Sequence, residues 1–552
     1  MRLLSPSIFL ASVFLSVVPI PGLAQAPQED PMKAVSVMGQ IESSVEEFNG
    51  VPLVTANWIG TLRPYLFKDG KFVPLIPDTL ENHLENLELW SATSISSHEV
   101  LMTGRQDGSS IAQMYLFDST TGKLTNLTNS PKTSDWGFCV SKRTPPLIAY
   151  SNDGTHFAEM REGKRIDVPL NEKITFSRCL WLDYDHVIGM EKDTIAHLCA
   201  FQKSGIECRK IPAFDKIDKA VNLFEGPHHE PGVIARLHKK QFFRPYMISK
   251  DLTALNEIQT VKGFQGDVLQ ILGKHIRVSK ESRYWVNGMK GSTTVLNLKE
   301  IGGRTYAVAG DFSTQKTLSV LSEDGTKWQL KLPLGARFKP PVSSPKEMWI
   351  SSPDGRKHQA FYFPPYGKSP QKLAAKVILL LHGGPHENVS PRLEPLHERL
   401  SRMGFGIFAF NYPGSSGRGA DYESLLSNAA VQRAAFRSVF DFIREQGVQV
   451  LVTWTISSGF ALQEFLLSSF ESPSGIVDEC GGDNSGIRKA AQEKRVDYFG
   501  IRGTNDHVEG NVVDFMYRGG HVLFSPTEFE RLFIVLDKFL NSLKPWKPGA
   551  KS

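Results

Sequence analysis

The chain has 552 residues, of which 41% are hydrophobic and 22% charged, and its formal net charge is +5. This composition is ordinary for a globular protein, and the length is too great for one hydrophobic core, so two or three domains are expected. The small net charge and the lack of a basic stripe argue against nucleic-acid binding. No Cys/His spacing typical of a zinc site is present.

The first 26 residues are predicted to be a secretory signal peptide. Arg2 supplies the positive charge, residues 8–20 are mostly apolar, and Ala24–Ala26 has the small-x-small pattern of a cleavage site. The apolar run is too short for a good transmembrane span, although an uncleaved anchor is the alternative. No later stretch reaches membrane-spanning length, so we expect an exported protein without a membrane span, periplasmic or extracellular, cleaved near Ala26.

Residues 30–345 show no long amphipathic helix. Short strand-like runs alternate with turn signals, among them the Asp-Gly pairs at 69–70, 153–154 and 324–325. Asp-Gly between apolar runs is a strong hairpin signal. At roughly 40–45 residues per blade, the segment would hold about seven blades of a β-propeller. The alternative is two stacked β-sandwich domains.

The five cysteines fit an exported protein, in which disulfides can form. Cys199 and Cys208 flank a turn signal, so a bridge across a hairpin is expected there. Cys139 and Cys179 could also pair, but the sequence does not decide it. Cys480 is expected to be buried and inert, and it is not predicted to be a nucleophile.

Beyond a connecting hairpin and linker at 346–375, strands and helices alternate. This pattern is the signature of an α/β domain, here residues 376–545. Strands are predicted at 377–381, 406–410, 448–453 and 496–501, and helices at 395–403, 431–446, 460–469 and 526–543.

The segment Val377–Leu381 is a continuous apolar run that leads into His382, Gly383 and Gly384. Such a run indicates a buried central strand of a parallel sheet. The glycines let backbone N–H groups approach whatever lies at the end of the strand, because they carry no Cβ. In α/β-hydrolases a loop of this kind supplies one oxyanion donor. A plain tight turn after a core strand is the alternative.

Several motifs in this domain resemble those of the prolyl oligopeptidase family of serine peptidases. They are HGGP at 382–385, NYPGSSGRG at 411–419, the hairpin at 349–365, the strand–turn–helix near 451–460, Asp506 and His521. The resemblance covers about residues 345–545, and the propeller only by architecture. It implies a β-propeller in front of an α/β-hydrolase domain, and hydrolysis through an acyl-enzyme without metal or cofactor. It also implies that the propeller limits entry to short or constrained peptides.

The nucleophile can be placed in two ways. A serine hydrolase carries its nucleophile on a sharp strand-to-helix turn, usually G-x-S-x-G. In one alignment 455–459 is this motif with its first Gly replaced, and Ser457 is the nucleophile. In the other, which needs no gap through the following helix and is the better alignment, Ile456 takes the Ser position and Trp454 that of the first Gly. That alignment predicts a site without a nucleophile, in which Ser457 and Ser458 serve only as helix caps.

The acid and the base are assigned by the same resemblance. Asp506, after the strand at 496–501, matches the family's Asp, and His521, before the last helix, matches its His. The order Ser, Asp, His is that of α/β-hydrolases. Only 15 residues separate Asp506 from His521, so helix packing between them must be reduced. His507 and His382 are weaker candidates for the base.

The sequence thus predicts an exported serine peptidase-like hydrolase that acts on peptide substrates. Ser457, Asp506 and His521 would be nucleophile, orienting acid and base, and Gly383 and Gly384 would help to hold the oxyanion. The alternative is a catalytically inactive pseudopeptidase that binds a peptide or a partner protein.

Overall fold

The computed structural model describes most of the chain from Val45 to Lys547. The described residues are 45–56, 62–77, 87–106, 111–128, 136–141, 143–151, 155–161, 163–170, 174–191, 193–202, 205–226, 230–258, 264–272, 275–286, 289, 293–311, 314–331, 345–384, 387–482, 484–504, 513–517 and 526–547. The predicted signal peptide lies outside them.

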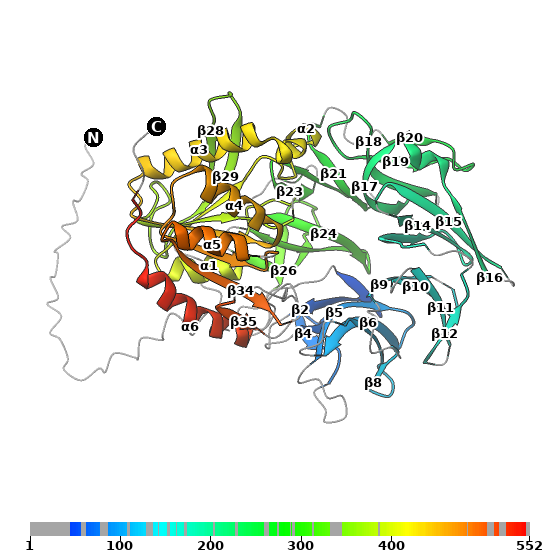
Figure 1. Cartoon of the computed structure of the whole chain (residues 1–552). Coiled ribbons are helices and arrows are strands. Elements are labelled where there is room, and N and C mark those ends of the chain that lie inside the picture. The colour runs from blue at the N-terminus through cyan, green and yellow to red at the C-terminus, as the bar shows by residue number, and fades with distance from the viewer. Residues whose placement is uncertain are drawn as a thin grey trace, which may run out of the picture.

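Seven small antiparallel sheets follow one another between residues 46 and 331 and form a seven-bladed β-propeller (Figure 1). Each sheet is built from consecutive strands, four per sheet except for three in the sixth, counted over the described residues. This arrangement confirms the predicted propeller and excludes the two β-sandwich domains.

The strands of the first four sheets are β1 (Glu46–Phe48), β2 (Val51–Ala56), β3 (Arg63–Lys68), β4 (Lys71–Pro74), β5 (Leu87–Ser94), β6 (Glu99–Gln106), β7 (Gln113–Asp118), β8 (Lys123–Asn126), β9 (Trp136–Val140), β10 (Leu147–Ser151), β11 (Thr155–Arg161), β12 (Lys164–Val168), β13 (Arg178–Trp181), β14 (His186–Glu191), β15 (Ile195–Gln202) and β16 (Gly205–Lys210). Those of the last three are β17 (Ile217–Glu225), β18 (Pro231–Leu237), β19 (Arg244–Ile248), β20 (Leu255–Glu257), β21 (Asp267–Leu272), β22 (His275–Lys280), β23 (Arg283–Val286), β24 (Thr294–Ile301), β25 (Arg304–Asp311), β26 (Thr314–Leu321) and β27 (Trp328–Lys331). A short 3₁₀ helix, η3 (Pro212–Lys216), precedes the fifth sheet.

The first and last sheets meet through side chains. Val54 of the first sheet shares a buried cluster with Val308 and Leu318 of the last. Lys299 Nζ lies 3.0 Å from Glu46 Oε2 across the same junction. Among the described strands, none is shared between these two sheets. In the described residues, packing, this ion pair and a hydrogen bond of 3.4 Å from Val45 N to Asn297 Oδ1 close the ring.

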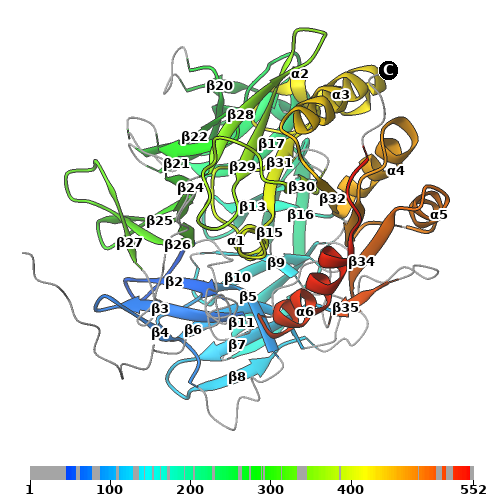
Figure 2. The ribbon, with the colours of Figure 1, turned by 90° about the vertical axis from the view of Figure 1, so that its left-hand side faces the viewer.

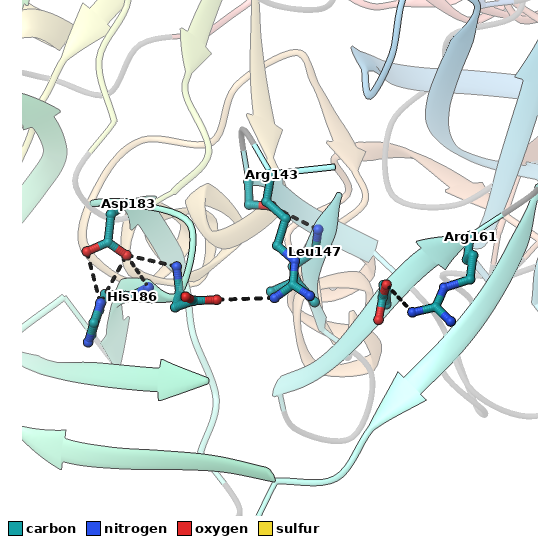
Figure 3. A network of polar contacts seen from close by, with 8 residues as sticks. Arg143, Leu147, Arg161, Asp183 and His186 are labelled. Atoms are coloured by element: carbon teal, nitrogen blue, oxygen red, sulfur yellow. Dashed lines mark hydrogen bonds and ion pairs between the residues drawn. The ribbon is translucent and has the colours of Figure 1, made fainter. Parts of the chain in front are cut away.

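The third and fourth sheets are linked more firmly. Arg143, which follows β9, forms an ion pair of 3.2 Å with Asp185, which precedes β14 (Figure 3). A disulfide joins Cys139 of β9 to Cys179 of β13, so this pairing, which the sequence left open, crosses from one blade to the next.

The second disulfide lies within the fourth sheet. It joins Cys199 of β15 to Cys208 of β16, which face each other in the strand register, as the hairpin prediction requires. Cys480 is free and buried, as expected.

The C-terminal domain is built on one eight-stranded mixed sheet. Its strands in spatial order are β28 (Lys346–Ser351), β29 (Lys357–Phe363), β31 (Gly406–Asn411), β30 (Lys376–Leu381), β32 (Val450–Ile456), β33 (Gly475–Glu479), β34 (Asp497–Gly503) and β35 (Phe515–Tyr517). The hairpin β28–β29, predicted as a connection, pairs with β31 and so extends this sheet; its two strands are antiparallel to their neighbours, and the others are parallel.

Helices cover both faces of this sheet. They are α1 (Pro395–Arg402), α2 (Ala420–Glu423), η4 (Ser424–Ser427), α3 (Ala429–Glu445), η5 (Ser457–Gly459), α4 (Phe460–Ser469), α5 (Ser485–Glu493) and α6 (Pro526–Ser542). Leu400 of α1 and Phe533 of α6 belong to the core on one face, and Phe436 of α3 and Leu466 of α4 to the core on the other (Figure 2). In the described part of the chain, no helix is both long and apolar enough to span a bilayer.

The glycine-rich loop after β31 forms much of the seam between the two domains. Glu281 N donates to Gly417 O at 2.8 Å, and Ala420 N donates to Gln241 O at 3.0 Å. Gly417 has φ +86°, and a Cβ there would lie 3.0 Å from Ser282 N. The glycine thus permits both the turn and the close approach of the propeller.

A buried ion pair also crosses the seam. Arg236 Nη1 of β18 lies 2.9 Å from Glu423 Oε2 of α2, and both side chains are less than a tenth exposed. Arg236 also contacts Asp218 through Nε, at 3.1 Å. Among the described residues, Arg236 therefore has two carboxylate partners, whereas Glu423 has Arg236 alone as its ion-pair partner.

Removal of one partner of this pair is expected to be costly. Arg236→Met leaves the Glu423 carboxylate buried beside an apolar side chain, which should lower the free energy of unfolding by about 3–5 kcal/mol. The double variant Arg236→Met/Glu423→Gln should recover a large part of that loss. Urea denaturation followed by tryptophan fluorescence measures both. If the loss of unfolding free energy in the double variant equalled the sum of the losses in Arg236→Met and Glu423→Gln, the two side chains would not be coupled.

A buried histidine in the C-terminal domain gives a pH dependence. The His358 side chain is 0% exposed, with Nε2 2.9 Å from Ser352 Oγ and Nδ1 3.0 Å from Tyr422 Oη. Burial, aided by the nearby Arg418 cation, lowers the pKa of His358 to about 4. An unfolded histidine titrates near about 6.5, so only the unfolded chain takes up this proton between these two values.

Stability should therefore fall as the pH is lowered from about 6.5 to about 4 and then level off for this group. The variant His358→Asn has no imidazole to protonate and should lose less stability over the same interval than the wild type. Urea midpoints measured at half-unit pH steps test the difference. Parallel curves for the two proteins would rule out His358 as a source of the slope.

Candidate active site

A sharp turn joins β32 to α4 at the carboxyl edge of the parallel sheet. Ile456 ends the strand with extended backbone, φ −117° and ψ 132°. Ser457 follows with φ +49°, and Phe460 begins the helix. A left-handed conformation is uncommon for a residue with a Cβ and is concentrated at functional sites. Ser457, which is partly exposed, therefore occupies the apex of the turn.

The turn after β30 lies directly against this apex. A Cβ on Gly383 would be 3.0 Å from the Cβ of Ser457 and 3.1 Å from Ile456 O. In return, a Cβ on Gly459 would be 2.8 Å from His382 O. These separations are shorter than ordinary van der Waals contact, so the two turns come this close only because both positions are glycine.

His382 supports the turn. Its side chain is 6% exposed, with Nδ1 2.9 Å from Gly383 O and Nε2 2.7 Å from Ser415 Oγ. The imidazole stacks on the Tyr412 ring at a centroid distance of 4.2 Å. Burial lowers the pKa of His382 to about 4, so it is neutral at neutral pH. These contacts give it a structural role in fixing Gly383.

The glycine-rich loop at 411–419 supplies that support. Tyr412 Oη donates to His382 O at 3.1 Å, and Ser415 Oγ lies 2.7 Å from Tyr412 O. Burial raises the pKa of Tyr412, so its hydroxyl remains a donor. Sequence reasoning identified the loop as a motif but did not assign these two side chains. Their partners lie about 30 residues away, and local spacing gives no sign of them.

The next two strands are joined by a buried network. Asp478 of β33, which pairs with Thr455 in the strand register, accepts a hydrogen bond from Arg502 Nη2 of β34 at 2.7 Å. Both side chains are fully buried. Tyr498 Oη donates to the same carboxylate at 2.8 Å. This network fixes the carboxyl ends of the strands that lie beside the Ser457 turn.

The predicted acid and base are not placed by this structure. Asp506, His507, His521 and Pro385 all lie outside the described residues. In the sequence, Asp506 comes three residues after the end of β34, and His521 comes four residues after the end of β35. The interval between them thus contains β35, a strand that the sequence did not predict. Of the predicted site residues, the structure brings Gly383 against Ser457, and Gly384 follows Gly383 in the same turn.

Comparisons with protein-family models and with curated proteins find no match to this sequence. Solved structures are similar over nearly the whole chain. An acylaminoacyl peptidase from Pyrococcus horikoshii has a TM-score of 0.66 at 13% identity, over 94% of this chain and 98% of the other. A puromycin-hydrolyzing peptidase from Mycobacterium tuberculosis has 0.69 at 11% identity, over 94% and 97%. A prolyl endopeptidase has 0.69 at 13% identity, over 92% and 90%. These similarities show that the chain has the fold of the prolyl oligopeptidase family.

Proposed function

We propose that the protein is an exported serine peptidase-like hydrolase that cleaves short or constrained peptides through an acyl-enzyme. The observation that carries the proposal is the backbone of Ser457, which is left-handed at the apex of a strand-to-helix turn. α/β-Hydrolases hold their nucleophile on a strained turn of this kind, because it exposes the hydroxyl above the sheet.

The same geometry supports the alignment that makes Ser457 the nucleophile. Ile456 belongs to β32 and pairs with Glu479 of β33, so its backbone is that of a strand residue. The apex falls on the residue that follows it. The resemblance to G-x-S-x-G is then broken only at Thr455, which replaces the first glycine.

The proposed chemistry follows the Ser-His-Asp scheme. His521 would take the proton of Ser457 Oγ as it attacks a peptide carbonyl, and Asp506 would orient the imidazole. The backbone N–H groups of Ser458 and of the Gly383–Gly384 turn would stabilise the oxyanion, each by about 3–4 kcal/mol. The order of the three residues and their sequence positions after β32, β34 and β35 support these roles.

The structural relatives support amide hydrolysis as the reaction class, since their names describe peptidases, one of them puromycin-hydrolyzing. The propeller supports restricted entry, because it is joined to the C-terminal domain along the glycine-rich loop. Export is supported by the apolar N-terminal segment that ends at Ala26.

One feature favours the alternative, an inactive pseudopeptidase that binds a peptide or partner protein. Thr455 occupies a position where the family has glycine, and its side chain is fully buried. Among the described residues, its Oγ1 has no hydrogen-bond partner. A turn crowded in this way could hold Ser457 in place without activating it, and the next experiment separates the two cases.

A fluorophosphonate probe should label the purified mature protein at Ser457, because such probes react with serines that are activated by a neighbouring base. The label should disappear in Ser457→Ala and His521→Ala and persist in the matched control Ser458→Ala. Peptide mapping by mass spectrometry locates it. A folded protein that takes up no label would identify the pseudopeptidase, and label on another serine would refute this assignment of the nucleophile.

The Gly383 contact predicts a second effect. In Gly383→Ala the new methyl meets the Ser457 Cβ and Ile456 O, so the turn must move away from the apex. The labelling rate should fall by roughly 10²–10³, the usual effect of losing one oxyanion donor. Gly486→Ala is the control, since a Cβ there meets nothing within 4 Å. Equal labelling rates in both variants would show that the turn takes no part in the reaction.

A further inference from the structure

Arg277 is a partly buried cation that has no carboxylate partner among the described residues. It lies on β22 in the sixth sheet of the propeller, its Nε is fully buried, and this nitrogen has no acceptor in the part of the chain that the structure describes. The residue as a whole keeps some exposed surface. No ion pair with a described carboxylate is formed, and among the described residues Tyr284 is the one group whose charge affects the pKa of Arg277.

Three arginines that are more deeply buried than Arg277 each have a carboxylate partner. Arg105 lies 2.8 Å from Glu88, Arg236 contacts Glu423, and Arg502 contacts Asp478. A guanidinium does not lose its proton in proteins under ordinary conditions, and an unpaired ion that is shielded from water is destabilising. Burial lowers the pKa of Arg277 to about 10, which reflects this unfavourable position.

Arg277 lies close to the seam with the C-terminal domain. Arg277 pairs with Val286 in the strand register and Ser279 with Tyr284, so Arg277 and Tyr284 share one face of the sheet. Asn388 Nδ2 donates to Tyr284 Oη at 2.8 Å. Asn388 comes four residues after Gly384, in the segment that leaves the candidate oxyanion turn.

The surroundings favour an anion. Burial raises the pKa of Tyr284 most strongly. The positive charges of Arg392 and Arg277 both act to lower it, against a smaller effect of Asp267 in the other direction. The charge of Arg392 is balanced by Glu394. The charge of Arg277 is balanced by no described residue and is available for a ligand.

We propose that Arg277 binds a carboxylate of the peptide, either its C-terminal carboxylate or an Asp or Glu side chain. A planar guanidinium binds a carboxylate through two parallel hydrogen bonds, which gives both affinity and orientation. The identity of the ligand as a peptide rests on the proposed function. Arg277 would thus determine specificity from the propeller side of the seam, without taking part in bond cleavage.

The test uses the full mature chain carrying Ser457→Ala, so that peptides are bound but not cleaved. Calorimetry measures the affinity of two pairs of peptides. The first pair is a tetrapeptide that has a free C-terminus and the same peptide as its C-terminal amide. The second pair is a Glu-containing tetrapeptide amide and its Gln counterpart. A carboxylate that pairs with Arg277 should tighten binding roughly tenfold to a hundredfold. The first comparison detects a C-terminal carboxylate, and the second detects an acidic side chain.

The preference for the peptide that carries the carboxylate should vanish in Arg277→Met and persist in Arg304→Met. Arg304 is an exposed arginine on the neighbouring sheet and is the matched control. Arg277→Met should also be at least as resistant to urea as the parent protein, because it removes an unpaired buried charge. Marked destabilisation would instead assign Arg277 a structural role and overturn the proposal, as would a carboxylate preference that survives Arg277→Met.

A second readout covers the case in which none of these peptides binds measurably. Sodium glutarate should raise the melting temperature of the parent protein more than that of Arg277→Met, and sodium chloride at equal ionic strength should not. Equal shifts for both proteins would overturn the proposal. The carboxylate preference is independent of whether the fluorophosphonate probe labels Ser457. A preference that depends on Arg277 without label on Ser457 would refute the hydrolase and retain the carboxylate site, whereas label without a preference would do the reverse.

Discussion

The contact between two turns at the carboxyl edge of the central sheet is the constraint on which the candidate site depends. Gly383 and Gly459 each stand where a side chain would strike the backbone of the opposite turn. The parallel pairing of β30 with β32 brings the two turns together, and the missing Cβ atoms let them touch. Ser457 is held in its left-handed conformation inside this contact. A side chain at either glycine would push the two turns apart and so separate the serine from the backbone N–H groups beside it.

The glycine-rich loop connects this contact to the propeller. Its first half supports His382 through Tyr412 and Ser415, and its second half meets the propeller at Gly417. Movement of the propeller against the C-terminal domain therefore acts on the same nine-residue segment that fixes the candidate oxyanion turn. The Arg236–Glu423 pair stabilises this arrangement just beyond the loop.

Much of the fold could be predicted from the sequence, because its long strands and helices have clear patterns. β30 is a run of five apolar residues, and α3 repeats its apolar positions at helical spacing. The strand β33 was missed because its sequence, GIVDE, contains only two apolar side chains, and β35 was missed because it has only three residues. Sequence alone could not place the apex of the turn, since Ile456 and Ser457 are adjacent in the chain. Only the φ angle, negative at Ile456 and positive at Ser457, shows which of them is the apex. The surroundings of Arg277 could not be predicted either, because the absence of a carboxylate partner among the described residues depends on how the chain packs.

The propeller ring has one junction that differs from the rest. At every other junction the polypeptide itself passes from one sheet to the next, and between the third and fourth sheets a disulfide adds a second covalent crossing. Between the first and last sheets, the described residues provide packed side chains, the Lys299–Glu46 pair and the hydrogen bond from Val45 N to Asn297 Oδ1, all of them non-covalent. Under mechanical load the ring would therefore part at this junction first, and it could do so with every backbone hydrogen bond of its sheets intact.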